Sequence, residues 1–438
     1  IKIIRGRIQP LIYINLQHKN MKNTGELTMQ RTKIKSKNIQ TKTKQQKVNL
    51  ETKIIEFVNK NSVVLFFVFI TLMAFILRYI FFTHKSGDYI CFISIWIEKL
   101  SQFEGFSGLG ENIGEYNVPY MFFLTLISKT PFNDLIEIKI FSIIFDFAGA
   151  FIAVKIISYL KNTRFFTPSN MLLYSLILFN PVVFLDSAYW AQCDFIYVSM
   201  IMVSVYYMLK EKFTPSMIFF GIALTFKLQS VMFLPVIIIF YFVSGKMKIK
   251  HFLWIPAVYG ISIVPALIAG RGLKDTLSIY VNQTGIYKQL TMNCPNIYNL
   301  LQGDYNMFRN AGIILTMGIL GTGALLFITK RKQFVRADML LLTIWVTQSC
   351  ICFLPSMHER YAFMTCIFSI LWSAFYKKDW WITVVINFVC LLSFTPYLCG
   401  IEIIKLGYLA VVNIAVFIIL SHELFVKTPK NNCLKVAA

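Results

Sequence analysis

The sequence predicts an all-α polytopic membrane protein with about twelve transmembrane helices. Of its 438 residues, 56% are hydrophobic, and the mean hydropathy is +0.61. Charged residues make up 15% of the chain, against roughly 25% in soluble domains. They fall in clusters between apolar stretches of about 20 residues, the length that crosses a bilayer as a helix. These observations exclude the ordinary soluble classes of protein.

The hydropathy pattern divides the chain into twelve candidate spans. Lipid offers no hydrogen-bond partner to an open backbone, so each span must be a helix. The predicted ranges are 62–82, 138–158, 170–185, 195–209, 216–225, 230–243, 252–269, 311–328, 339–354, 362–375, 382–397 and 406–420.

The connection between the first two spans is long and has structure of its own. Residues 89–103 form an amphipathic segment with Phe92, Ile95, Trp96 and Leu100 on one helical face, as expected for a helix along the membrane interface. The apolar piece at 117–130 is too short to cross, and we interpret it as a half-helix in the outer leaflet. A full crossing there would invert the side of every later loop.

Lysine and arginine in the short connections predict the orientation. Alternate connections are basic, and so are both ends of the chain. The other set is not: residues 83–137 hold three lysines against seven acids. With twelve spans, the basic connections and both termini lie in the cytosol.

The first 60 residues carry 14 lysines and arginines against three glutamates. No aromatic stacking pattern or nucleic-acid motif accompanies this charge. We therefore interpret 1–60 as a largely disordered cytosolic arm near anionic lipid, with no nucleic-acid partner. A transmembrane domain at 61–425 and a cytosolic tail at 426–438 follow. Since the first residue is Ile, Met21 and Met29 are candidate natural starts.

Polar residues that need an explanation gather on the predicted extracytoplasmic side. They lie in the stretches Gly87–Tyr89, Tyr189–Asp194, Phe226–Gln229, Tyr280–Leu301 and Pro355–Tyr361. A lysine between two apolar helices, as at Lys227, is costly unless it faces a wet or anionic cavity. The nine cysteines show no CxxC pair or zinc spacing, so we expect buried small side chains and no metal site.

These residues predict a site for a sugar and a phosphate. Asp88 can act as general base toward a hydroxyl, and Lys227, His358 and Arg360 can hold a phosphate. Aromatic faces pack on a pyranose ring, and amide or carboxylate groups bond its hydroxyls. The candidates for sugar or acceptor binding are Trp190, Gln192, Asp194, Gln229, Tyr116, Tyr120, Asn293 and Asn296. The combination predicts glycosyl transfer from a lipid-linked sugar phosphate.

Each principal candidate also has a structural interpretation. Asp88 can be a solvated loop acid, Asp194 the N-cap of the following helix, and Lys227 a snorkelling side chain. The segment with His358 and Arg360 can form a cap and an ion pair at a helix turn. We interpret Asp146, inside the second span, as a packing or hydrogen-bonding residue of the bundle.

Six segments together resemble the GT-C superfamily of polyprenyl-phosphate-sugar-dependent glycosyltransferases. They are SGDYICFISIWIEKL, YNVPY, FNPVVFLDSAYWAQCD, FKLQ, TMNCPNIYNL and LPSMHERY. The resemblance covers about residues 80–376. It is closest to bacterial membrane proteins similar to the GPI mannosyltransferases, and the order of features also resembles the dolichyl-phosphate-glucose glucosyltransferases.

The resemblance implies a GT-C type fold and an inverting hexosyltransferase, with mannose the first choice of hexose. Asp88 would deprotonate the acceptor, Lys227, His358 and Arg360 would lie on the donor-phosphate side, and Trp190 on the sugar side with Gln192 and Asp194. The donor would be a polyprenyl-phosphate hexose, and the acceptor a glycan, glycolipid or protein. Tyr89 and Ile90 follow Asp88 where some members carry a second acid, so we expect no metal cofactor.

The composition, rich in Lys, Asn and Ile, suggests a bacterial cytoplasmic membrane as the location. An alternative function is a transporter or flippase for a lipid-linked sugar or polar solute, since interrupted helices and buried charges occur there too. Against it, the two halves of the chain show no inverted repeat, and the polar residues collect on one side.

Overall fold

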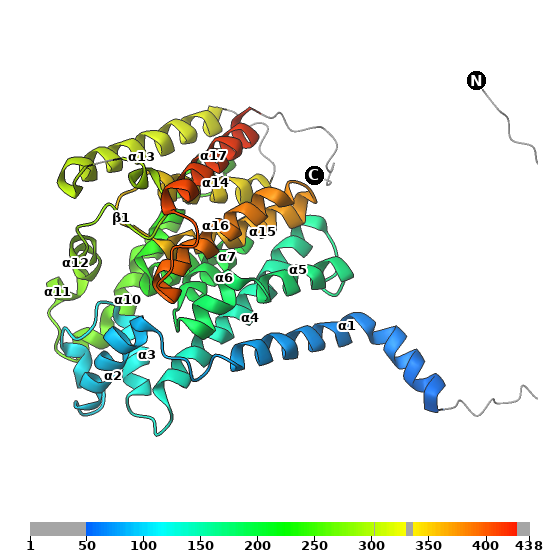
Figure 1. Ribbon diagram of the computed structural model, residues 1–438, viewed down its shortest axis with the longest axis horizontal. Coiled ribbons are helices and arrows are strands. Elements are labelled where there is room, and N and C mark those ends of the chain that lie inside the picture. Colours follow the sequence, from blue (N-terminus) through cyan, green and yellow to red (C-terminus); the bar gives the residue numbers. More distant parts are fainter. Residues whose placement is uncertain (1–49, 302, 330–335, 427–438) are drawn as a thin grey trace, which may run out of the picture. The chain divides into compact units, whose positions relative to one another are not determined.

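The protein is almost entirely helical in a computed structural model that describes residues 50–301, 303–329 and 336–426 (Figure 1). The helices are α1 (Leu50–Tyr79), α2 (Ser94–Ser101), α3 (Val118–Ile127), α4 (Asp134–Lys161), α5 (Pro168–Leu178), α6 (Pro181–Phe184), α7 (Asp194–Leu209), α8 (Phe213–Phe226), α9 (Leu234–Ser244), α10 (Trp254–Ile268), α11 (Leu273–Leu277), α12 (Ile279–Ile286), α13 (Tyr305–Thr329), α14 (Asp338–Phe353), α15 (Phe363–Tyr376), α16 (Trp380–Cys399) and α17 (Leu406–Phe425). Two short strands, β1 (Thr291–Met292) and β2 (Met357–His358), pair in parallel. Short π or 3-10 turns include η1 (Tyr89–Ile93), η3 (Leu185–Tyr189), η4 (Leu228–Phe233), η6 (Ile297–Asn299) and η8 (Glu359–Ala362).

The chain divides into two units, 1–60 and 61–438. Of the first unit the structure describes residues 50–60, which belong to α1. The rest of the predicted arm, 1–49, and the tail beyond Val426 lie outside the described residues. The second unit holds the apolar core and all the candidate site residues.

Six described helices are long and apolar enough to cross a membrane: α1, α4, α13, α16, α17 and the segment Ile249–Ile268 that ends in α10. A seventh crossing is possible if α5 and the following helix, Pro181–Tyr189, count as one span bent by 46°. These helices indicate a membrane protein. They confirm the all-α membrane class.

The prediction of twelve spans is confirmed only in part. Predicted spans such as 195–209, 216–225 and 230–243 correspond to apolar helices of 10–17 residues. At 1.5 Å per residue these reach about 15 to 26 Å, short of a hydrocarbon core of about 30 Å. Helices α14 and α15 are buried over most of their surface. A buried apolar helix and a lipid-facing one have the same hydropathy, which is why the sequence does not separate them.

The connection between α1 and α4 differs from its predicted pattern. Trp96 and Leu100 are buried as expected, but they share the buried face with Ile93 and Ile97, whereas Phe92 and Ile95 are exposed. The wider π turn η1 precedes α2 and shifts the residues that follow relative to a regular helix of 3.6 residues per turn. The segment predicted as a half-helix contains α3, whose 10 residues are too few to cross a bilayer.

A buried ion pair connects α1 to α4. Arg78 Nε donates to Asp146 Oδ2 at 2.7 Å, and both side chains are fully buried. The Ser187 hydroxyl donates to the same oxygen at 2.5 Å. The structure thus supports the interpretation of Asp146 as a hydrogen-bonding residue of the bundle and adds its charged partner.

We predict that Asp146→Ala destabilises the protein strongly, because it leaves the Arg78 guanidinium buried without a counter-charge. Breaking such a pair costs about 3 to 5 kcal/mol, whereas replacing both partners by apolar residues is often neutral. The melting temperature of the purified protein should fall for Asp146→Ala and recover in Arg78→Met/Asp146→Leu. Glu98→Gln, at an exposed position of α2, is the control. A double variant as unstable as the single one would contradict this account.

Candidate functional site

Asp88 lies just after α1, where residues distant in sequence surround its carboxylate. Trp190 Nε1 donates to Oδ2 at 3.1 Å, and Gln192 Nε2 donates to the same oxygen at 2.5 Å. The Tyr397 hydroxyl donates to Oδ1. The side chain remains 15% exposed, so the carboxylate is oriented by hydrogen bonds and still reaches solvent.

Irregular backbone after α6 brings Trp190 and Gln192 to this acid. The chain passes through the π turn η3 and then adopts a left-handed conformation at Ala191, with φ of +64°. Two backbone hydrogen bonds hold the turn: Trp190 N–H to Leu185 and Gln192 N–H to Asp186. Ser86 fixes the other side, since its hydroxyl donates to the Trp190 carbonyl at 2.6 Å.

Arg360, in η8, lies among three carboxylates. Nη2 is 3.4 Å from Asp88 Oδ2, Nη1 is 3.9 Å from Asp194 Oδ2, and Nε is 3.5 Å from Glu359 Oε1. The guanidinium carbon lies 4.9 Å from the centroid of the Trp190 ring, a cation–π distance. Burial alone would lower the pKa of Arg360, but the neighbouring carboxylates outweigh it and raise that pKa. Arg360 is therefore a permanent cation.

Among the described side chains, Arg360 also carries unsatisfied donors. Its Nε and Nη1 are buried and have no hydrogen-bond partner, and neither has Asp194 Oδ2. Buried polar atoms without partners are rare in native proteins. The loose contacts of 3.5 and 3.9 Å leave the guanidinium able to take another acceptor.

Lys227 pairs with Asp194 at the break between α8 and η4. The backbone of Lys227 is extended, with φ of −151° and ψ of 133°, and its Nζ contacts Asp194 Oδ1. Burial would lower the pKa of Lys227, but the Asp194 carboxylate raises it further than burial lowers it. The lysine is thus charged and already neutralised.

The structure corrects the structural interpretations of Asp194 and Lys227 that the sequence left open. Asp194 is not the N-cap of α7, because the cap position is Cys193 and no side chain caps that helix end. Lys227 does not snorkel to water, since its side chain is 8% exposed. Burial raises the pKa of the neighbouring Cys193 thiol to about 11, so that thiol stays protonated at neutral pH.

The residues described so far form one cluster: Asp88, Trp190, Gln192, Asp194, Lys227 and Arg360. His358 lies at its edge. Its ring lies 5.4 Å from Tyr287 and 5.2 Å from Tyr361, and Nδ1 is 3.9 Å from Glu359 Oε2. The pairing of Met292 with His358 connects the loop after α12 to this segment. Within the described residues, no hydrogen bond joins the imidazole to Asp88.

Of the remaining candidates, the two tyrosines and Gln229 lie at or near the cluster, whereas the two asparagines lie in the loop after α12. Tyr116 belongs to the cluster: its hydroxyl donates to Gln192 Oε1 at 3.2 Å, its ring lies 4.5 Å from that of Tyr120, and Lys227 Nζ is 6.0 Å from the Tyr116 ring. Gln229 also borders it, through Tyr361, with which it interacts.

The two asparagines have local roles. Asn293 has a φ of +53° and forms a backbone bridge with His358. Asn296 is fully buried and accepts from Tyr298 N–H at 3.1 Å, capping η6. Its Oδ1 is thus used within the loop, whereas its buried Nδ2 has no hydrogen-bond partner among the described residues.

Sequence reasoning missed Tyr397 as a site residue. Its ring stacks on Trp190, with centroids 5.0 Å apart and planes at 15°, and its hydroxyl reaches Asp88. Tyrosines at the ends of membrane helices are so common that no sequence signal separates this one. Asp186, buried near Asp194, and Glu359, buried beside Arg360, were likewise not among the candidates.

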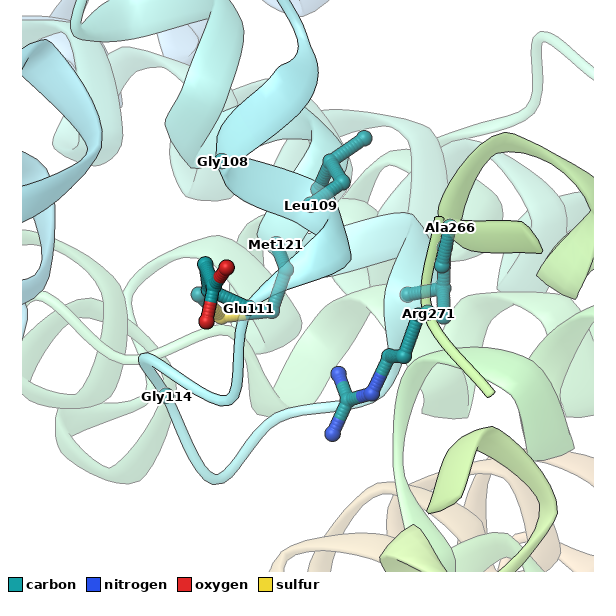
Figure 2. A pocket seen from close by; sticks show the side chains of 8 residues that line it. Gly108, Leu109, Glu111, Gly114, Met121, Ala266 and Arg271 are labelled. Carbon is teal, nitrogen blue, oxygen red and sulfur yellow. The ribbon is translucent and has the colours of Figure 1, made fainter. Parts of the chain in front are cut away.

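A small pocket lies elsewhere, between residues 108–121 and the end of α10 (Figure 2). It is lined by Gly108, Leu109, Glu111, Gly114, Val118, Met121, Ala266 and Arg271. Arg271 Nη2 donates to Asn112 Oδ1 at 2.9 Å. None of the residues that contact Asp88 lines this pocket. Among the described residues, no group of three or more His, Cys, Asp or Glu side chains is placed to hold a metal ion.

No protein-family model matches the chain, and no curated protein matches it either. The functional argument therefore rests on the site.

We predict that Lys227→Met destabilises the protein by several kcal/mol, because it leaves the Asp194 carboxylate buried without its lysine. Adding Asp194→Asn should restore most of the loss, since the double variant buries no unpaired charge. Thermal unfolding of the purified single and double variants measures the coupling. Additive losses in the double variant would show that the two side chains act independently.

Proposed function

We propose that the protein is a membrane glycosyltransferase. It transfers a hexose, with mannose the first candidate, from a polyprenyl-phosphate hexose to a hydroxyl acceptor on the extracytoplasmic face, with inversion. The observation that carries this proposal is the partly exposed Asp88 carboxylate beside Arg360 and the Trp190 ring. A base, a cation and an aromatic face are the groups that transfer from a sugar phosphate requires.

The phosphate of the donor has a suitable partner in Arg360. Its buried Nε and Nη1 have no hydrogen-bond partner among the described residues, and a guanidinium can donate two parallel bonds to a phosphate. Lys227 is less suited to direct contact because Asp194 occupies it. We therefore assign donor-phosphate binding first to Arg360, and assign Lys227 to holding Asp194 in place.

The proposed reaction is a single displacement. The acceptor hydroxyl gives its proton to the Asp88 carboxylate while its oxygen forms a bond to C1 of the hexose. The bond from C1 to the phosphate oxygen breaks, and its electron pair leaves with the polyprenyl phosphate. The fixed charge of Arg360 stabilises the negative charge that grows on the departing phosphate. Asp88 then returns its proton to solvent.

Charge balance limits how the donor can bind. Asp88, Asp194 and Glu359 already surround Arg360 and Lys227, so a phosphodiester adds negative charge to a cluster that holds three carboxylates against two cations. Arg360 can accommodate it by moving away from its most distant carboxylate, Asp194 at 3.9 Å. Donor binding should therefore shift the guanidinium toward the phosphate.

The second candidate is a transporter or flippase for a lipid-linked sugar. The bend between α5 and the next helix and the break at Lys227 favour it, because broken helices around buried charge are common in transporters. A transporter would move the lipid-linked sugar across sealed vesicles without changing it. A glycosyltransferase consumes it, so analysis of the products separates the two.

The proposed location is a bacterial cytoplasmic membrane, with both termini in the cytosol and the site outside. Cys91 and Cys399 are exposed cysteines close to the site. Cys91 lies within η1, three residues after Asp88, and Cys399 ends α16, two residues after Tyr397, whose hydroxyl contacts Asp88. We predict that an impermeant maleimide labels both in intact cells, in variants that retain one cysteine each. A variant that retains Cys433, in the predicted cytosolic tail, should react only after permeabilisation. The reverse pattern would place the site in the cytosol.

We predict that Asp88→Asn lowers the transfer rate by about 10²- to 10⁴-fold, the usual contribution of a general base. The amide keeps the size of the side chain but cannot take the proton. Transfer from a synthetic short-chain polyprenyl-phosphate mannose, by protein in lipid nanodiscs, provides the measurement. Glu98→Gln should transfer normally. Full activity in Asp88→Asn would exclude Asp88 as the base, and strict dependence on a nucleotide sugar would exclude the proposed donor.

A further inference from the structure

The two oxygens of the Asp88 carboxylate have different surroundings. Oδ2 accepts hydrogen bonds from Trp190 and Gln192 and faces Arg360. Within the described chain, the one donor to Oδ1 is the Tyr397 hydroxyl. A carboxylate oxygen has about two lone-pair sites. Oδ2 is therefore fully used, and a further hydroxyl can approach Asp88 only at Oδ1.

Tyr397 covers the Trp190 ring as well as Oδ1. The two rings are stacked at 5.0 Å, Arg360 lies over the indole too, and Trp190 is fully buried. Tyr397, in contrast, is 41% exposed. It is thus the outermost side chain over both the acid and the aromatic face.

The backbone around Tyr397 is built for this contact. Gly87 has no side chain, and a Cβ there would lie 3.0 Å from the Tyr397 hydroxyl oxygen. Pro396 interrupts the last turn of α16, because it has no N–H to donate to Leu392. The Thr395 hydroxyl donates to the Leu392 carbonyl instead, at 2.9 Å. The end of α16 therefore lacks one backbone bond of a regular helix.

From this arrangement we infer that Tyr397 occupies the acceptor subsite and that a saccharide displaces it. The inference rests on the proposed function and names its acceptor class. When Tyr397 moves aside, Oδ1 becomes free for a hydroxyl, and the face of Trp190 becomes free for the apolar face of a pyranose ring. A carbohydrate can use both, because it has a hydroxyl for Oδ1 and a ring face for Trp190. Water or a serine side chain can bind only at Oδ1.

We predict that Tyr397→Phe binds saccharides more tightly than the natural protein. The ring stays, but the acceptor no longer competes with a phenol hydroxyl for Oδ1. Losing one such competing hydrogen bond corresponds to about a fivefold change in affinity. In transfer assays, the KM for methyl α-D-mannopyranoside should fall about fivefold with little change in kcat. Gly87→Ala, which displaces the hydroxyl without removing it, should shift KM in the same direction.

The test has a binding arm and a transfer arm, both with the full-length chain in nanodiscs. The binding arm uses saturation-transfer NMR with methyl α-D-mannopyranoside, with glycerol as a probe that has hydroxyls but no ring face. Tyr89→Phe is the matched control, because the Tyr89 hydroxyl donates to Asp134 at 2.9 Å and not to Asp88. The transfer arm measures kcat and KM for the same saccharide.

The two proposals fail in different ways. Tighter saccharide binding by Tyr397→Phe without any transfer would support the subsite and remove the glycosyltransferase function. Transfer with a lower kcat and an unchanged saccharide KM in Tyr397→Phe would overturn the subsite, since Tyr397 would then merely orient Asp88. Equal saccharide affinity in the natural protein, Tyr397→Phe and Tyr89→Phe would also overturn it.

Discussion

The compensation of buried charge is the constraint on which the rest of this structure depends. In an apolar helical protein, an ionised side chain without a partner costs several kcal/mol. Arg360 lies between Asp88 and Asp194, and Lys227 neutralises the other oxygen of Asp194. Each charge lowers the free-energy cost of burying the oppositely charged side chain beside it. The cluster therefore acts as a unit, and its members come from four separate parts of the chain because no single helix could present them together.

The irregular backbone of the protein serves this cluster. Ala191 and Ser356 adopt left-handed conformations, and Lys227 is extended between two helices. Ala191 lies between Trp190 and Gln192, Ser356 lies two residues before His358, and Lys227 is itself a residue of the site. A left-handed conformation at a residue other than glycine costs free energy and persists where the surrounding packing over-determines it. Here the packing comes from short buried helices such as α7, α14 and α15, which hold the breaks at fixed places.

The sequence predicted the members of the cluster better than their partners. Polar residues in apolar surroundings are conspicuous, so Asp88, Trp190, Gln192, Asp194, Lys227 and Arg360 could be singled out, and the structure brings them together. The pairing of Lys227 with Asp194 depends on how α7 lies against the break after α8, which no local pattern reveals. Tyr397 was missed for a related reason. A tyrosine at a helix end has the same sequence pattern whether it faces a site or lipid. The structure confirms six or seven of the twelve predicted spans as helices long enough to cross; the sequence does not separate the others because burial in protein and burial in lipid select the same residues.

The cluster combines a rigid side with a loose one, and this asymmetry is what makes it suited to chemistry. Trp190, Gln192 and Lys227 are buried and engaged, so they fix the position of both carboxylates. Arg360 keeps buried donors without partners, and Tyr397 is the exposed contact of Asp88. A site that served stability alone would gain by satisfying the guanidinium and burying the tyrosine, since unsatisfied polar atoms weaken a fold. A phosphate would satisfy the free donors of Arg360, and a hydroxyl could replace Tyr397 at Asp88; both side chains lie against the Trp190 ring. The arrangement of the loose groups, more than the presence of the acid, therefore supports a site for two substrates.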